Sequence, residues 1–135
     1  MHPVVLFYNP DRETERSIAM LCMRLKIKIR KVVPAQYHQP LGALLGMDET
    51  EALPGIYEGG GFPDQMLVFH GFNDGLLDRF LQEYRRARIP RIGLKAVVTP
   101  HNIHWDSIRL HQELMQEEAA MHPKHTNQDE TSEGN

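Results

Sequence analysis

The sequence predicts a small α/β protein with a four-stranded, mostly parallel sheet of order 2-1-3-4 and helices on both faces. Two runs, residues 4–8 and 66–69, are apolar at every position, which is typical of inner strands covered on both sides. Each run leads through a polar turn and an amphipathic segment to a further strand-like segment, so a β-α-β plan occurs twice. A ferredoxin-like α+β sheet of order 4-1-3-2, antiparallel with helices on one face, is the alternative.

The first unit starts with the predicted strand 4–8, which ends at a turn where Asn9 can cap a helix and Pro10 fits its first position. One face of the helix that follows carries Ile18, Leu21, Cys22 and Leu25. Residues 27–33 then alternate apolar and basic side chains at first, which indicates an edge strand with one face in water. Pro34 ends that strand.

The link at 35–64 is the least regular part, and only a short helix within 39–47 is predicted there. A parallel sheet requires this link to cross the sheet. The second unit comprises a strand at 66–70, a helix, and a strand at 91–99, followed by a last helix at 106–121. The helix between these strands carries an apolar face of Leu76, Leu77, Phe80, Leu81 and Tyr84.

Length and composition predict one domain at 1–121 and a disordered polar tail at 122–135. The formal charge of −3 gives no indication of nucleic-acid binding. No apolar run approaches the ~20 residues of a membrane span, and the N-terminus does not resemble a signal peptide. Cys22 is the only cysteine, which excludes an internal disulfide and favours a cytoplasmic location.

In a doubly wound sheet, ligands bind beyond the carboxyl ends of the strands where the strand order reverses. Here that crevice is expected between the first and third strands. The polar turns after three strands supply its candidate ligand-binding residues. These are Asn9, Asp11, His70, Asn73, Asp74, Thr99, His101 and Asn102.

We therefore expect a non-enzymatic binding or regulatory module that takes a small molecule or a protein partner at this crevice. The alternative is a small acid–base enzyme that uses His70 with Asp74 or Asn102. No Ser-His-Asp order, nucleotide fingerprint or two-cysteine redox motif is present, and no cofactor is predicted. A homodimer through the edge strand or the last helix is a further expectation.

Other residues favour ordinary structural roles. His101, His104 and His111 lack the compact ligand set of a zinc site, so no metal is predicted. Lys95 is interpreted as an edge-strand lysine that deters strand pairing, although a buried lysine could also act as a base or form a Schiff base.

The pattern Pro90-x-x-x-Leu94-Lys95-Ala96-Val97-Val98-Thr99-Pro100-His101-Asn102-x-x-Trp105 resembles the bacterial domain-of-unknown-function 3783 family. Leu67-Val68-Phe69-x-Gly71-Phe72 and the Leu-Leu-x-x-Phe-Leu helix precede it, as in that family. Residues 39–47 are similar to the N-terminal half that accompanies the domain in small proteins of anaerobic gut bacteria. The resemblance covers residues 4–120. It implies a short cytoplasmic protein and no particular activity.

Overall fold

The computed structural model describes residues 2–121, so the predicted polar tail lies outside the described part. In chain order the elements are β1 (Val4–Tyr8), α1 (Arg12–Arg24), β2 (Lys28–Val32), a 3₁₀ turn (Pro34–Gln36), α2 (Leu41–Leu44), β3 (Met66–His70), α3 (Asp74–Arg86), β4 (Leu94–Val97) and α4 (Ser107–Met121). None of the helices in this described part combines the length and the apolar character that a membrane crossing requires.

The four strands form one sheet in the order β2-β1-β3-β4, which confirms the predicted order and the α/β class. The outer pairs, β1 with β2 and β3 with β4, are parallel. The central pair, β1 with β3, is antiparallel. The sheet is therefore mixed, and the prediction of a mostly parallel sheet holds for the outer pairs but not at its centre.

The path of the link between β2 and β3 explains the antiparallel centre. Tyr8, at the end of β1, lies beside both Val32, where β2 ends, and Met66, where β3 begins. The link thus leaves β2 and enters β3 at the same end of the strands, past β1, and does not run to the opposite end as a parallel connection would. Asn9 fixes its return, because the Asn9 side-chain amide donates to the carbonyl oxygens of Phe62 (2.7 Å) and Asp64 (2.9 Å).

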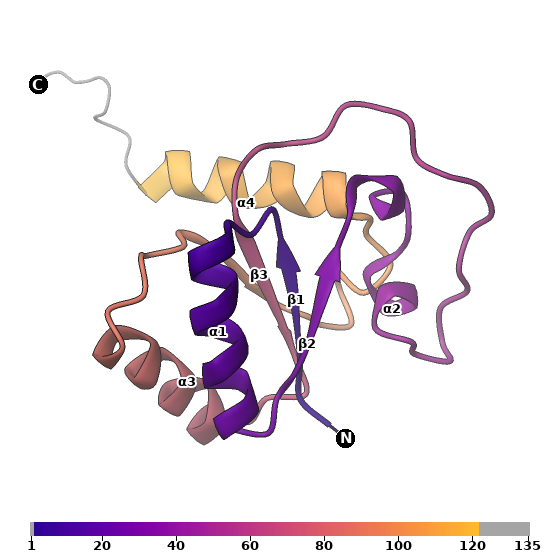
Figure 1. Ribbon diagram of the computed structural model, residues 1–135. Coiled ribbons are helices and arrows are strands. Elements are labelled where there is room, and N and C mark those ends of the chain that lie inside the picture. The colour runs from indigo at the N-terminus through magenta and orange to yellow at the C-terminus, as the bar shows by residue number, and fades with distance from the viewer. Residues whose placement is uncertain (1, 122–135) are drawn as a thin grey trace, which may run out of the picture.

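Helices cover both faces of the sheet, as predicted (Figure 1). α1 and α3 pack on the face that presents Val5 and Phe7 of β1. α2, α4 and the link cover the opposite face, where Leu6 and Tyr8 lie. Because successive side chains of a strand point to opposite faces, burial on both sides accounts for inner strands that are apolar at consecutive positions.

The first strand and the helix of each β-α-β unit repeat at an interval of 62 residues, whereas the final strands, β2 and β4, start 66 residues apart (94 − 28). β1 and β3 start at Val4 and Met66 (66 − 4), and α1 and α3 start at Arg12 and Asp74 (74 − 12). β1 and β3 pair over their full length about Leu6 and Val68, and α1 and α3 share one face. An approximate twofold axis therefore runs through the sheet between its two inner strands.

The repeat extends to the backbone of the turns. Asn9 (φ 53°) corresponds to Gly71 (φ 80°), and Lys26 (φ 60°) corresponds to Arg88 (φ 58°). These left-handed conformations follow each inner strand and each helix, where the chain must reverse direction. A Cβ atom at Gly71 would lie 2.8 Å from the carbonyl oxygen of His2, so this position requires glycine for space as well as for φ.

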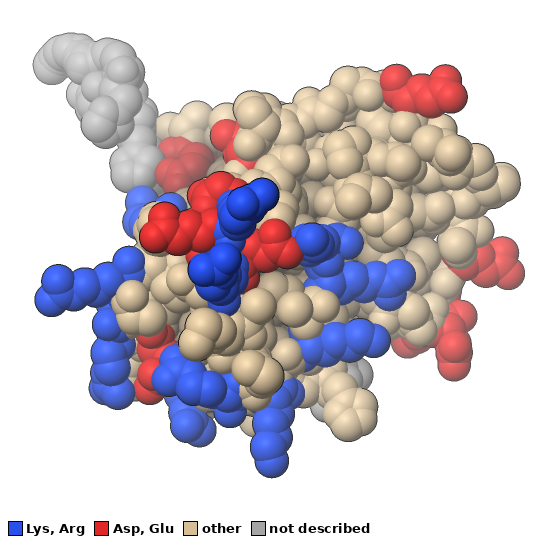
Figure 2. Space-filling model, viewed as in Figure 1, with Lys and Arg blue, Asp and Glu red and all other residues tan. Residues whose placement is uncertain are grey.

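Charge is distributed unevenly between the units and the link. Residues 32–78 contain no lysine or arginine, so the link that covers one face carries only acidic charges. Figure 2 shows the basic side chains gathered over the half of the molecule that contains α1, α3 and β2. On β2, Lys28, Arg30 and Lys31 are exposed along the sheet edge. Such an edge resists pairing with further strands.

Candidate functional site

The crevice predicted between the first and third strands does not form, because β1 and β3 are antiparallel. Val4 at the start of β1 pairs with His70 at the end of β3. Asn9 and Asp11 consequently follow β1 at one end of the sheet, whereas His70 ends β3 at the other. The three polar turns could lie at the same end of the sheet only if the inner strands were parallel. The link returns at the same end of the sheet, so β3 runs antiparallel to β1.

At the first end, the predicted site residues hold the backbone in place. Asn9 binds the link through two carbonyl groups, as described above. Asp11 caps α1, since one carboxylate oxygen accepts from the Thr14 backbone N–H (2.8 Å) and the other from its hydroxyl (3.0 Å). These bonds from Thr14 hold the pKa of the Asp11 carboxyl below its usual value.

At the other end, most candidates also support turns and helix ends. Asn73 caps α3 through a bond from the backbone N–H of Leu76 (2.7 Å), and Asp74 is exposed in the first turn. Asn102 closes the turn after β4, because its side chain accepts from the Thr99 N–H (2.9 Å) and donates to the Val97 carbonyl (3.1 Å). These asparagines act on the backbone, as turn chemistry predicts.

Thr99 and His101 complete that turn. The Thr99 hydroxyl accepts from the backbone N–H groups of His101 and Asn102, each at 3.2 Å. The exposed His101 ring and the Trp105 indole form a T-shaped contact with 5.3 Å between their centroids. The turn is therefore held by side-chain hydrogen bonds to its own backbone.

A smaller version of the predicted crevice exists where β3 and β4, which are parallel, end side by side. It is a hollow of about 370 Å³, which we call the strand-end hollow. Its lining residues are Met47, Glu49, His70, Val98, Thr99, Pro100, Ile103 and His104. Two predicted site residues, His70 and Thr99, thus meet here with Glu49 and His104.

His70 occupies a distinctive position among these residues. It lines the strand-end hollow and also a second hollow of about 400 Å³ beside Val4, Lys26 and Lys28. Its side chain is half-buried and forms no hydrogen bond within residues 2–121. The imidazole can therefore donate to or accept from a molecule in either hollow.

His111 has a role that the sequence did not reveal. Its Nε2 lies 2.7 Å from Asp64 Oδ2, and its ring stacks on Phe62 at 4.0 Å between centroids. α4 is thereby tied to the end of the link. Only the long-range fold creates this contact, so no local spacing could have signalled it. Among residues 2–121, no group of His, Cys, Asp and Glu side chains is arranged to hold a metal ion.

Fold and site together define a small α/β protein with a mixed sheet and a hollow beyond its parallel strand ends. Residues 65–121, from β3 to α4, match the family described as Domain of unknown function (DUF3783). The match confirms the resemblance over these residues, whereas the resemblance of residues 4–64 remains a prediction. Neither the curated proteins nor the solved structures include a match to this chain.

Proposed function

We propose that this protein is a non-catalytic binding module that takes a small molecule in the strand-end hollow. The observation that carries the proposal is the hollow of about 370 Å³ in which His70 lacks a hydrogen-bond partner within residues 2–121. Volumes of roughly 300–1,000 Å³ are usual for small-molecule sites, which combine apolar walls with a few polar groups. The hollow has that composition.

The lining suits a compact molecule with an apolar body and a polar head. Val98, Pro100 and Ile103 supply apolar wall, and His70 and Glu49 supply groups that can bind the head. Hydrogen bonds within the turn at 99–102 hold the wall before a ligand arrives, which reduces the ordering cost of binding. A lone, buried cysteine is compatible with the cytoplasm, which is where we place this function.

The alternative function, acid–base catalysis by His70 with Asp74 or Asn102, has no specific observation in its favour. Within residues 2–121, no hydrogen bond joins His70 to either residue. Both polar atoms of the Asn102 amide are engaged by the turn. A protein partner at the strand-end crevice and a homodimer through the edge strand or the last helix both remain predictions, and light scattering of the purified chain tests self-association.

A thermal-shift screen of a metabolite panel tests the proposal. A ligand present at 100 times its Kd stabilises the native state by about 2.7 kcal/mol, which raises Tm by several degrees. We expect at least one compound to do so with the wild-type chain. The same compound should not stabilise His70→Ala, whereas His101→Ala, a control on the same end that lies outside the hollow, should respond as wild type.

Two results would contradict the proposal. In the first, no member of a broad panel stabilises the protein. In the second, a stabilising compound acts equally on wild type and His70→Ala, which would locate its binding elsewhere. Circular dichroism of both variants without ligand establishes beforehand that each retains the native fold.

A further inference from the structure

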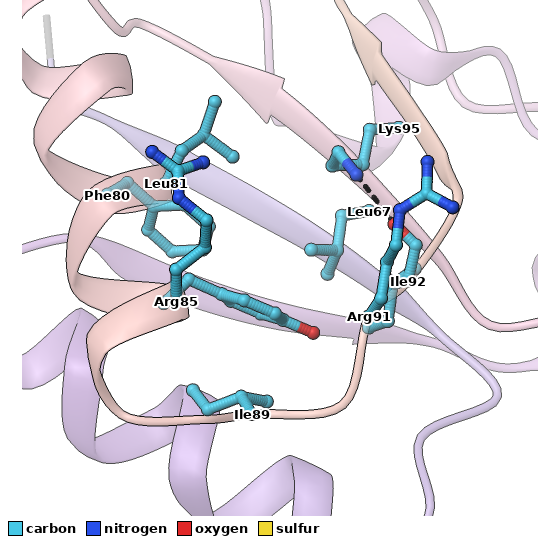
Figure 3. Close-up of a pocket in the computed structure, with 9 residues that line it drawn as sticks. Leu67, Phe80, Leu81, Arg85, Ile89, Arg91, Ile92 and Lys95 are labelled. Carbon is cyan, nitrogen blue, oxygen red and sulfur yellow. Dashed lines mark hydrogen bonds between the residues drawn. The ribbon is translucent and has the colours of Figure 1, made fainter.

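A second cavity, remote from the strand-end hollow, lies between α3 and β4 near the start of β4 (Figure 3). We call it the α3–β4 cleft. Its volume is about 180 Å³. It exists because the alternating side chains of β4 place Leu94 under α4 but Lys95 on the opposite face, beside α3. The loop from 87 to 93 closes one end.

The floor of the cleft is apolar and buried. Leu67 of β3, Phe80 of α3 and Ile92 of the loop are almost inaccessible to solvent. Tyr84 adds its ring, and its hydroxyl is already used in a bond to the Pro90 carbonyl (2.5 Å). The floor therefore offers surface for an apolar group, and the hydroxyl proton of Tyr84 is already donated.

Three cationic side chains from three different segments surround this floor. Arg85 approaches from α3 on one side, and Arg91 of the loop and Lys95 of β4 approach from the other (Figure 3). No acidic residue lines the cleft. Within residues 2–121, neither guanidinium forms a hydrogen bond or an ion pair. Three like charges at one opening repel one another, and a bound anion would offset that repulsion.

Lys95 is held in position rather than extended into solvent. Its Nζ donates to the Ile92 carbonyl at 2.7 Å, which leaves two further N–H groups for a ligand. Burial and the neighbouring Arg91 lower the pKa of Lys95, while Glu118 opposes that shift. A lysine that served only to deter edge pairing would extend away from the sheet, so the observed position indicates more than that role.

We propose that the α3–β4 cleft binds a small carboxylate with an aromatic or branched aliphatic body. A cavity of about 150 Å³ lined by apolar side chains accommodates benzene, so about 180 Å³ suffices for one ring of that size. The carboxylate would meet the guanidinium groups of Arg85 and Arg91, whose planar donors match its two oxygens. The body of the ligand would lie on Leu67 and Ile92.

The probe that tests this proposal is benzoate, with acetate and benzyl alcohol as comparisons. Acetate keeps the charge without the ring, and benzyl alcohol keeps the ring without the charge. We expect chemical-shift changes on titration of benzoate at the methyl groups of Leu67 and Ile92, and none at Ile103 in the strand-end hollow. Benzyl alcohol should bind at least about tenfold more weakly because it cannot form the charge-assisted hydrogen bonds. Acetate should also bind at least about tenfold more weakly because it lacks the apolar surface of the ring.

Matched arginine variants separate the cleft from general electrostatic attraction. Arg85→Gln and Arg91→Gln should each weaken benzoate binding by about tenfold. Arg79→Gln, which removes an exposed arginine of α3 outside the cleft, should leave it unchanged. Absence of benzoate binding would overturn the proposal. Equal weakening by all three variants, or equal binding of benzoate and acetate, would also overturn it. Because the two sites are separate, none of these results bears on the strand-end hollow.

Discussion

Replacement of Ser107 by alanine removes the hydrogen bond that joins α4 to β1. Ser107 Oγ and Tyr8 Oη are 2.7 Å apart, and both side chains are 0% exposed. In Ser107→Ala the phenol of Tyr8 is left without a partner in the core, and burial of an unsatisfied polar group costs about 1–3 kcal/mol. We therefore expect a loss of about 2 kcal/mol. Tyr8→Phe should lower the free energy of unfolding by about 1–2 kcal/mol, because it leaves only the smaller serine hydroxyl without a hydrogen-bond partner.

The double variant, Tyr8→Phe with Ser107→Ala, provides the decisive comparison. Removal of both polar atoms leaves none unsatisfied, so its cost should be about 1 kcal/mol, below the sum of the single variants. Urea unfolding followed by circular dichroism measures each free energy. Ser17→Ala, on α1 with no side-chain hydrogen bond in the described part of the chain, is the control and should be neutral within about 0.5 kcal/mol. Strict additivity of the two single variants would refute the reasoning.

Three further predictions concern the turn, the thiol and the tyrosines. Gly71→Ala should destabilise the fold by about 1–3 kcal/mol, because its φ is positive and its Cβ would lie 2.8 Å from the carbonyl oxygen of His2. Gly75→Ala, whose Cβ would lie no closer than 3.6 Å to another atom, should be neutral or stabilising. Equal urea midpoints of the two variants would contradict this prediction. Cys22 is 1% exposed, and burial raises the pKa of its thiol to about 12. A thiol reagent should therefore modify Cys22 at least ~1,000-fold faster in urea than in buffer. Rapid labelling of the folded chain would contradict this prediction and show that α1 opens. Burial raises the pKa of Tyr84 to about 12 and also raises that of Tyr8. Because both pKa values exceed the unfolded value of about 10, the stability they contribute is complete below pH 10 and is lost as pH rises toward 12. The phenolate absorbance of Tyr8 and Tyr84, obtained as the difference between wild type and the matching Tyr→Phe variants, should therefore appear together with the loss of circular dichroism. Its appearance in a folded protein near pH 10 would count against burial of these two phenols.

The strand order and the coverage of both faces could be predicted because burial leaves a direct mark on composition. Strands 4–8 and 66–69 are apolar at successive positions, and only a strand covered on both sides requires that. Strand direction leaves no such mark, since an apolar run reads alike in either orientation. The direction of β3 depends on where the link returns, and that depends on Asn9 binding carbonyl groups more than 50 residues away.

The candidate site was only partly predictable for the same reason. His70 and Thr99 meet because β3 and β4 are parallel, which the second β-α-β pattern predicts. Asn9 and Asp11 lie elsewhere because the central pair is antiparallel. A short polar residue between a strand and a helix is first of all a cap, and that rule would have identified Asp11 and Asn73 as structural. The α3–β4 cleft was not predicted, since it depends on how the loop 87–93 folds back beside Lys95.

A protein built from one such unit alone would expose the flank of its inner strand to water, and a twin chain rotated by half a turn could cover it. Here the first unit covers that flank within the same polypeptide, since β1 pairs with β3 in the position that a second chain would take. The backbone hydrogen-bonding edges of both inner strands are consequently paired within one chain. Within residues 2–121, the strand edges that remain open for pairing between copies are that of β2, which carries exposed cations, and the short outer edge of β4.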